Sequence, residues 1–290
     1  MKGIIIINAF SDNEEYLYQA RRMKEEFTRK GVHLDIVRND SFLLYIKDNS
    51  IVSKIAGYDF CVYWDKDKYI LKMLEKLGVP TFNCFDSIEK CDDKMLTYIE
   101  LANQGIPVPD SLPGLLCYTD EEEISEETLN SAEALGYPLI LKDSFGSLGN
   151  GVRLIKDREE LKTQLDKVKC TPYLLQEFIE TSYGRDVRII VIGGEVIGGM
   201  LRTGDKDFRS NIGSGGIGEP YELSDEMKEL AIKVAEILKL DYCGIDVLFG
   251  KNGPVICEVN SNAFFYAFEN ATKINVAEKY AGYIIKKTAQ

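Results

Sequence analysis

The stretch YCGIDVLFGKNGPVICEVN, residues 242–260, decides the fold of the C-terminal part of this 290-residue chain. Two runs rich in apolar and β-branched residues flank the turn signal Lys251-Asn252-Gly253, which predicts a β-hairpin. Side chains in a strand alternate between two faces. The expected faces of the second strand are Ile256, Glu258 and Asn260 on one side and Val255, Cys257 and Val259 on the other.

The register of this hairpin decides whether two acids meet. A three-residue turn with Gly253 in the left-handed region places Asp246 directly across from Glu258, whereas a two-residue Asn-Gly turn moves Glu258 to the opposite face. Facing carboxylates repel, and burying them uncompensated costs several kcal/mol each. A divalent cation removes this cost, and oxygen ligands fit Mg²⁺ or Mn²⁺ better than zinc. The hairpin predicts a metal site of Asp246, Glu258 and Asn260; the alternatives are a solvated strand edge or a carboxylate paired with arginine.

A glycine-rich loop follows an apolar strand in LKDSFGSLGNGV, residues 141–152. Glycines let backbone N–H groups approach an anion, and Lys142 at the end of the strand adds positive charge. The spacing is neither that of a Walker A loop nor that of a dinucleotide fingerprint. A flexible hairpin loop would have the same composition, so it is Lys142 that favours an anion site.

Positive charge is concentrated between residues 185 and 209 of an otherwise acidic chain. This segment contains Arg185, Arg188, Arg202, Lys206 and Arg209. Its stretch RDVRIIVIGGEVIGGMLR is predicted to be a hairpin around Gly193-Gly194. Arginines inside strands that otherwise bury apolar faces need an anion. The alternative is a network of ion pairs with Asp186, Asp205 and Asp207. The Gly-rich segment SNIGSGGIG, residues 210–218, is expected to act as a lid.

The first 88 residues have the pattern of a small parallel α/β lobe. A buried Ile-rich strand is followed by a helix with apolar residues at helical spacing, and further strands and a helix continue to residue 82. A helix is predicted over residues 87–105, with Cys91, Met95, Ile99 and Ala102 on one stripe, and proline-rich IPVPDSLPG ends it at a lobe junction.

Composition excludes several classes of function. The net charge of −12 and the pI near 4.8 argue against nucleic-acid and anionic-membrane partners, and no apolar run reaches membrane length. Seven scattered cysteines suggest neither a disulfide framework nor a metal knuckle, and are typical of a reducing cytoplasm. The one histidine, His33, lies in an N-terminal strand, so no catalytic triad is expected.

Taken together, PLILK, GSLGNGV, LLQEFIE, RDVRIIVIGGEVIGGMLR, DFRSNIGSGG, LDYCGIDVLF and VICEVNSN resemble the motifs of ATP-grasp carboxylate-amine ligases. The resemblance is to the RimK-like glutamate ligase branch and covers residues 88–285. It implies a mixed α/β and α+β ATP-grasp fold. A parallel α/β lobe, residues 1–88, precedes a central lobe, residues 89–175, and a C-terminal lobe, residues 176–290, and the last two clamp ATP.

The resemblance also implies roles for individual residues. The ATP-binding set is Lys94, Lys142, Gly146, Ser147, Gly149, Gly151, Glu177, Phe178, Asp186, Ser210 and Asn211. Within it the lysines hold phosphates, Glu177 and Phe178 line adenine, and Asp186 lies near the ribose; the alternative for Lys94 is a solvated helix lysine. The catalytic set is Arg188, Arg202 and Arg209, and the metal ligands are again Asp246, Glu258 and Asn260.

The chemistry implied is phosphoryl transfer from ATP to a carboxylate, followed by attack of an amine on the acyl phosphate. Glutamate or another amino acid is expected to be joined to a peptide, protein or small amine, by a homo-oligomer. After EVN the chain has SNAFFYAFE, where the family often has a Pro-Gly-containing segment. This departure makes Ser261 a candidate substrate contact. The aromatic residues of the segment either take part in substrate choice or pack beneath the following helix. The alternative functions are an ATP-binding regulator without turnover and a ligase that closes rings in ribosomally made peptides.

Overall fold

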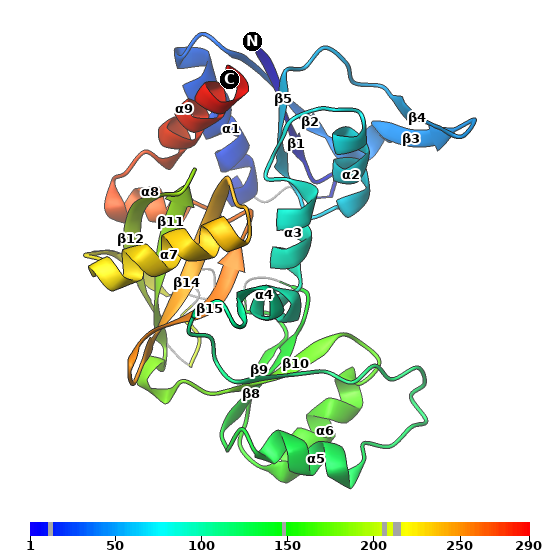
Figure 1. The fold of residues 1–290 in the computed structure, drawn as a ribbon, viewed down its shortest axis with the longest axis vertical. Helices are drawn as coiled ribbons and strands as arrows, with labels where there is room; N and C mark the ends of the chain where they lie inside the picture. The colour runs from blue at the N-terminus through cyan, green and yellow to red at the C-terminus, as the bar shows by residue number, and fades with distance from the viewer. Residues whose placement is uncertain (11–13, 147–148, 205–207, 211–215) are drawn as a thin grey trace.

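The computed structural model describes residues 1–10, 14–146, 149–204, 208–210 and 216–290. Within these ranges the strands form three larger sheets and one two-stranded sheet. Figure 1 shows the N-terminal and C-terminal parts of the chain side by side, with the central sheet and its two helices below them. No helix in these ranges has the length and apolar character needed to span a bilayer.

The N-terminal sheet is parallel, as predicted, with strand order β2-β1-β5-β6. Its strands are β1 (Lys2–Ile7), β2 (His33–Arg38), β5 (Phe60–Trp64) and β6 (Thr81–Phe82), and its helices are α1 (Glu14–Arg29) and α2 (Lys68–Lys76). Residues 4–7 of β1 are fully or almost fully buried, as in a strand covered on both faces. A 3₁₀ turn, η1 (Asn39–Ser41), leads to a small hairpin, β3 (Leu44–Lys47) and β4 (Ser50–Ser53).

The single helix predicted over residues 87–105 is wrong. Two helices occupy this segment, α3 (Phe85–Asp92) and α4 (Lys94–Leu101). Asp93 has extended backbone angles between them, and its carboxylate accepts a hydrogen bond from the backbone N–H of Met95 at 2.9 Å. This N-cap satisfies a donor that a new helix leaves free, so the chain breaks there and Lys94 becomes the first residue of α4.

The central sheet is antiparallel, with order β7-β10-β8-β9. The strands are β7 (Ser111–Pro113), β8 (Leu139–Asp143), β9 (Val152–Ile155) and β10 (Tyr173–Glu177). Helices α5 (Glu126–Glu133) and α6 (Arg158–Val168) lie together beside this sheet (Figure 1). Their apolar residues form a core with the sheet that contains no residue of the other two larger sheets.

The C-terminal sheet is also antiparallel, with order β13-β12-β11-β14-β15. Its strands are β11 (Arg185–Ile192), β12 (Glu195–Thr203), β13 (Ile217–Tyr221), β14 (Tyr242–Gly250) and β15 (Gly253–Asn260), and η2 (Glu180–Ser182) precedes them. The predicted hairpin around Gly193-Gly194 is confirmed. Helix α7 (Asp225–Ile237) packs on this sheet, and Ser224 caps it.

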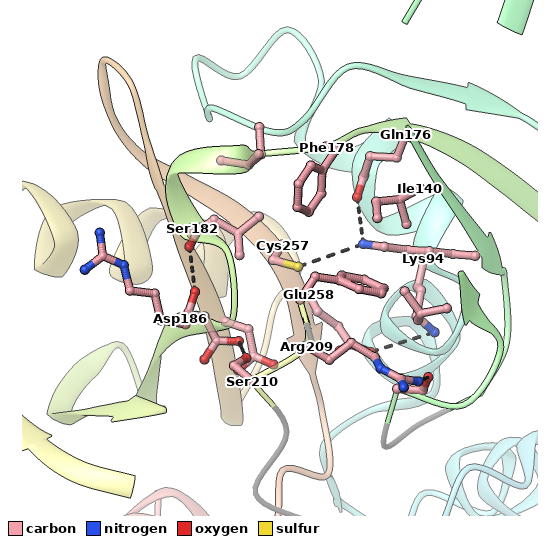
Figure 2. A pocket seen from close by; sticks show the side chains of 18 of the residues that line it. Lys94, Ile140, Gln176, Phe178, Ser182, Asp186, Arg209, Ser210, Cys257 and Glu258 are labelled. Carbon is pink, nitrogen blue, oxygen red and sulfur yellow. Dashed lines mark hydrogen bonds and ion pairs between the residues drawn. The ribbon is translucent and has the colours of Figure 1, made fainter. Parts of the chain in front are cut away.

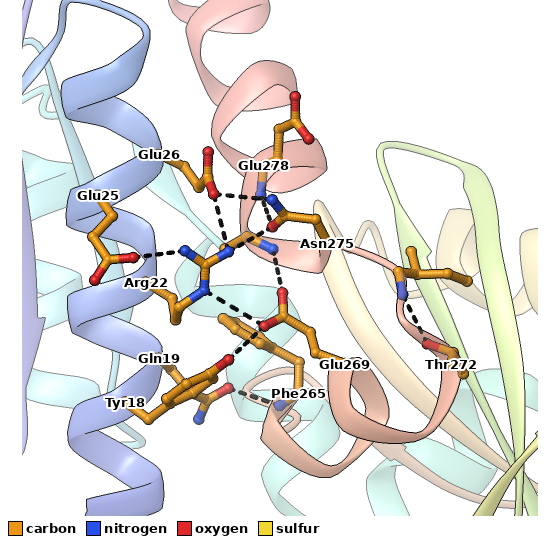
Figure 3. Close-up of polar contacts among 12 residues, drawn as sticks. Tyr18, Gln19, Arg22, Glu25, Glu26, Phe265, Glu269, Thr272, Asn275 and Glu278 are labelled. Carbon is orange, nitrogen blue, oxygen red and sulfur yellow. Dashed lines mark hydrogen bonds and ion pairs between the residues drawn. The ribbon is translucent and has the colours of Figure 1, made fainter.

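The last two helices, α8 (Tyr266–Thr272) and α9 (Val276–Thr288), fasten the C-terminal part to the N-terminal lobe. Figure 3 shows Arg22 of α1 between Glu26 of the same helix and Glu269 and Asn275 of the C-terminal segment. One continuous apolar core also joins β1 and β5 with β11, β14 and α9. Phe265 is fully buried in that core, which confirms the packing alternative for this aromatic residue.

Candidate functional site

A cavity lies between the central and C-terminal sheets, and most of the predicted ATP-binding residues line it (Figure 2). The lining residues that the sequence predicted are Lys94, Lys142, Gly146, Gly149, Glu177, Phe178, Asp186, Arg202, Arg209, Ser210, Asp246 and Glu258. Gly151, Arg188, Asn260 and Ser261 do not line it. Ser147 and Asn211 lie outside the described residues.

Two buried lysines point into the cavity from different elements. Lys142 at the end of β8 donates to Gln176 Oε1 at 2.6 Å. Lys94 donates to the carbonyl oxygen of Gly146 at 3.0 Å, and its Nζ lies 3.8 Å from Glu258 Oε1. Burial lowers the pKa of Lys94, against the opposing effect of Glu258. Burial also acts against the charge of Lys142, but Cys257, Tyr98 and Glu258 raise its pKa. Two ammonium groups held this way can bind a polyphosphate.

The glycine-rich loop beside these lysines has the backbone that its sequence suggested. Gly146, Gly149 and Gly151 have φ angles of 126°, 74° and 76°. A Cβ atom at Gly151 would lie 2.1 Å from Asp143 Oδ2, and the positive φ angle also favours glycine at this position. Arg209 Nη1 donates to the carbonyl oxygen of Gly149 at 3.2 Å, which links the loop to the C-terminal lobe.

Asp246 and Glu258 are direct cross-strand partners, but the turn is not the three-residue one from which this pairing was expected. Gly250 pairs with Gly253, so the turn holds only Lys251 and Asn252. The register then shifts between Asp246 and Val247, because β15 carries one extra residue there. This β-bulge restores the pairing that a two-residue turn alone would have destroyed.

The bulge also changes which way neighbouring side chains point. Ile256 and Val259 enter the same apolar core, so the prediction that they lie on opposite faces is wrong. Cys257 faces the cavity together with Glu258, and its Sγ lies 3.9 Å from Lys142 Nζ. Strict alternation assigned Cys257 to the other face, and nothing in the residue types of the strand indicates the inserted residue.

The arginines form an ion-pair network with the acids of this site. Arg188 binds both carboxylate oxygens of Asp246 at 2.7 Å. Arg202 binds both oxygens of Asp186 at 2.7 and 2.6 Å and also lies 2.8 Å from Asp246. The Ser210 hydroxyl donates to Asp186 at 2.6 Å. Asp246 is therefore paired with arginine, which was the alternative to a metal site. Asp186 forms the ion pair that was the alternative to an external anion. Asp205 and Asp207 lie outside the described residues.

These pairs set the ionisation of Asp246. Burial acts to raise its pKa, but Arg188 and Arg202 outweigh burial and lower it. Asp246 is 3% exposed, so its carboxylate depends on these two guanidinium groups for compensation. Removing either arginine leaves a buried anion without part of its partner set.

The oxygen atoms on the β14–β15 hairpin fit a hard cation such as Mg²⁺ that also binds water or phosphate oxygens. Asp246 and Glu258 supply carboxylate oxygens from opposed positions, and Asn260 follows two residues later. In the described part of the chain, no three His, Cys, Asp or Glu side chains form a cage of their own. Mg²⁺ typically takes one or two carboxylates and completes its shell with water and phosphate oxygens.

Apolar side chains form part of the cavity lining. They belong to Ile140, Val152, Phe178, Ile179 and Leu248. The Phe178 ring contacts Tyr183 and Phe208 edge to face, which fixes its orientation. Figure 2 shows the Phe178 ring near Gln176 and Ile140. A flat aromatic group can pack against such apolar side chains, and Glu177 lines the same cavity.

Other functional candidates were missed in the sequence. Gln176, Ser182 and Cys257 line the cavity although no motif singled them out, and Arg185, which the sequence indicated only by its charge, lines it as well. Gln176 orients Lys142 and receives support from Ser111, to which its amide donates at 2.9 Å. The alternation of β10 could have indicated Gln176, because it lies two residues from Leu174, which pairs with Lys142. The predicted substrate contact Ser261 is 2% exposed, and its hydroxyl has no hydrogen-bond partner among the described residues.

Comparison with known proteins shows the family of this chain. The sequence profile of the RimK-like ATP-grasp domain matches residues 91–284. The chain belongs to the RimK-like ATP-grasp family. This confirms the family resemblance seen in the sequence, and members of ATP-grasp families bind ATP.

Two curated relatives are similar over most of this chain. The human N-acetylaspartylglutamate synthase A is 39% identical over 87% of this chain and 63% of its own length. The human beta-citrylglutamate synthase B is 38% identical over 91% of this chain and 75% of its own length. This chain thus spans less than two thirds of the first of these enzymes.

The predicted fold is confirmed by a solved structure. A RimK domain ATP-grasp protein from Sphaerobacter thermophilus superposes with a TM-score of 0.74, covering 98% of this chain and 99% of that one at 20% identity. At this identity the similarity concerns the fold alone.

Proposed function

We propose that this protein is an ATP-dependent carboxylate-amine ligase that forms an amide bond through an acyl phosphate. The observation that carries the proposal is that Lys94, Lys142, Asp246 and Glu258 converge on one cavity. A phosphate-binding pair of cations next to a metal-binding pair of acids fits phosphoryl transfer better than simple binding. Family membership agrees with this, since the two curated relatives are both named synthases.

The nucleotide is proposed to lie with adenine against Phe178 and Glu177 and its phosphates between the lysines and the glycine loop. Asp186 and Ser210 would face the ribose side. Mg²⁺, or Mn²⁺, would be held by Asp246 and Glu258 with the amide of Asn260, and would neutralise phosphate charge when bound. Ser147, Gly151 and Asn211 remain candidate nucleotide contacts.

The arginines are proposed to stabilise charge on the transferring phosphoryl group. Arg202 and Arg209 line the cavity, and Arg188 lies behind Asp246. A guanidinium group offers two parallel N–H donors and stays charged, which matches phosphate oxygens. The residues of this chain then need only hold the carboxylate in line with the phosphoryl group and exclude water, because the amine itself attacks the acyl phosphate.

The amine substrate is proposed to be glutamate. In both product names, N-acetylaspartylglutamate and beta-citrylglutamate, the acyl group belongs to the other component and glutamate carries the amide nitrogen. The carboxylate partner differs between those enzymes, so here it is proposed only as a small acid, peptide or protein. Ser261 can act on this substrate only through its neighbours, because its side chain is buried. We further propose a cytoplasmic homo-oligomer.

The test is a matrix of amines against carboxylates, with ADP release and product mass measured together. ADP should form only when glutamate and a carboxylate are both present, and the product mass should equal their sum less water. ATP binding without turnover for every pair would instead identify a regulator on this fold. ADP formed without any amine would overturn the amide-forming step.

A further inference from the structure

The central lobe contains two cysteines that the site does not use. Cys117 lies in the segment between β7 and α5, and Cys170 lies in the turn between α6 and β10. They are separated by more than 50 positions in the sequence, so cysteine spacing gave no sign of a pair. Cys170 is exposed, Cys117 is half-buried, and neither lines the nucleotide cavity.

The backbone brings these two positions opposite each other. Strands β7 and β10 are antiparallel, with Pro113 paired to Leu174, and the pairing continues beyond the strand because Gly114 N donates to Tyr173 O at 2.8 Å. Continuing this register brings residue 117 opposite residue 170. Cys117 N donates to the carbonyl oxygen of Lys169 at 3.3 Å, so the two segments still touch there.

A buried lysine holds the segment in this position. Lys169 is 5% exposed, and its Nζ donates to the carbonyl oxygens of Asp120 and Glu122 and to the carboxylate of Asp166, each at 2.7 Å. The anchored segment therefore cannot move away from the α6–β10 turn without breaking the two hydrogen bonds that the buried ammonium group donates to Asp120 and Glu122.

Each of the two thiols donates a hydrogen bond to an oxygen of the segment that follows Cys117. Cys170 Sγ donates to Asp120 Oδ1 at 3.2 Å, and Cys117 Sγ donates to the carbonyl oxygen of Thr119 at 3.0 Å. The hydrogen bond to Asp120, then burial, then a hydrogen bond with the Cys117 thiol raise the pKa of Cys170 to about 11. In the described part of the chain this cluster does not form a metal-binding group of three ligands. Two facing thiols without a metal are suited to oxidation.

We infer that Cys117 and Cys170 are a modification site, at which a small-molecule disulfide such as oxidised glutathione converts the two thiols into an intramolecular disulfide. The exposed Cys170 thiolate attacks one sulfur of the small disulfide, and the first small thiolate leaves. The Cys117 thiolate then attacks the Cys170 sulfur and displaces the second. Two protein thiols are oxidised to one disulfide, one small disulfide is reduced to two thiols, and the two protons pass to the departing thiolates.

Asp120 controls how fast this reaction runs. It keeps Cys170 protonated, and only the thiolate reacts, so oxidation is slow near neutral pH and faster as pH rises. Replacing Asp120 by Asn is expected to lower the pKa of Cys170. The oxidation rate should rise about threefold for each unit by which that pKa falls, because lost nucleophilicity cancels part of the gain in thiolate.

The experiment treats the full, reduced chain with oxidised glutathione, blocks the remaining thiols and maps the peptides without reduction. We expect one dominant cross-linked peptide pair containing residues 117 and 170, lighter than the separate peptides by two hydrogen atoms and separable by dithiothreitol. The same treatment in urea should scatter the seven cysteines over many pairings. The matched control Cys84→Ser should keep the cross-link, whereas Cys117→Ser and Cys170→Ser should each abolish it.

Three results would overturn the proposal. One is a stable glutathione adduct on Cys170 of the wild-type chain, which would mean that Cys117 does not reach it. Another is full blocking of both thiols after oxidation of the folded protein. The third is an equal yield of the 117–170 peptide pair in folded and urea-unfolded protein, which would mean that the fold does not favour this pair.

Discussion

Asp246 lies directly across from Glu258 even though the turn that joins their strands holds only two residues. The extra residue that restores this pairing is Cys257 of β15, next to Glu258, and its side chain lines the cavity. The proposed metal site thus depends on an irregularity of the strand and not on the turn.

Replacing Glu258 by Gln should reduce ATP turnover by about 100-fold or more, because a neutral amide loses the charge that would hold a metal beside the phosphates. ADP release under saturating substrates measures it. Glu219→Gln, at an exposed position of β13, is the matched control and should keep full turnover. Unchanged turnover in the Glu258 variant would remove this residue from the proposed metal site.

The affinity for ADP should depend on pH through Lys94. Its pKa is lowered, so its charge is present at low pH and lost earlier than that of an ordinary lysine as pH rises, while the raised pKa of Lys142 keeps that residue charged. The dissociation constant for ADP should therefore increase between about pH 7 and pH 10, where ordinary lysines are still largely charged. Titration calorimetry across this range measures it.

Lys94→Arg supplies the control for this pH effect. Arginine stays charged throughout the range, so the variant should show a flatter profile whatever its absolute affinity. Lys156→Arg, at an exposed position, should keep the wild-type profile. Identical profiles for wild type and Lys94→Arg would show that another group causes the pH effect.

Replacing Arg202 by Gln should destabilise the fold by about 3–5 kcal/mol, since it leaves the buried carboxylates of Asp186 and Asp246 without a shared partner. Urea unfolding at neutral pH measures this. Arg153→Gln is the matched control, because its ion pair with Asp143 is about one third exposed and should contribute only about 0–1 kcal/mol. Equal losses of unfolding free energy in both variants would show that the buried ion pairs of Arg202 are no more important for stability than a partly exposed one.

The difference in unfolding free energy between wild type and Arg202→Gln should depend on pH, and its sign follows from Asp246. The pKa of Asp246 is lowered in the folded state, so its contribution to stability is complete above the ordinary aspartate pKa and is lost as pH falls through the lowered value. The gap between wild type and Arg202→Gln should therefore shrink in acid.

Replacing Asn83 by Ala should cost about 3 kcal/mol or more. This 1% exposed residue follows β6; it donates to the carbonyl oxygens of Tyr242 and Ser261 and accepts from the N–H groups of Asp241 and Tyr242. The variant leaves four buried backbone groups without partners. Urea unfolding measures the loss, and Asn252→Ala, at the exposed hairpin turn, should change stability little. A loss of less than about 1 kcal/mol in the free energy of unfolding of Asn83→Ala would show that its four hydrogen bonds contribute little to stability.

Residue types and periodicity were enough to predict the parallel N-terminal sheet and the glycine-rich loop, whereas the nucleotide-binding roles came from the family resemblance and stay predictions. The Ile-rich first strand, the Gly193-Gly194 hairpin and Lys142 at a strand end are encoded by neighbouring residues. Such features can be predicted without knowledge of the fold. The helix break at Asp93 was also encoded locally, because aspartate is a strong N-cap, but the continuous apolar stripe outweighed it in the prediction. Boundaries near residues 88 and 175 stay predictions.

The donors available for phosphate, metal and carboxylate can be read from the sequence, because they depend on residue type and on strand period. Which of them meet depends on how the chain folds in three dimensions. Cys257 enters the cavity through a bulge, Arg202 joins two acids on different strands, and Asn83 clamps segments more than 150 positions away. The first two contacts arise from strand pairing within one sheet and the third from the packing of the N-terminal lobe against the C-terminal sheet, and neither leaves a periodic trace in the residues that make them.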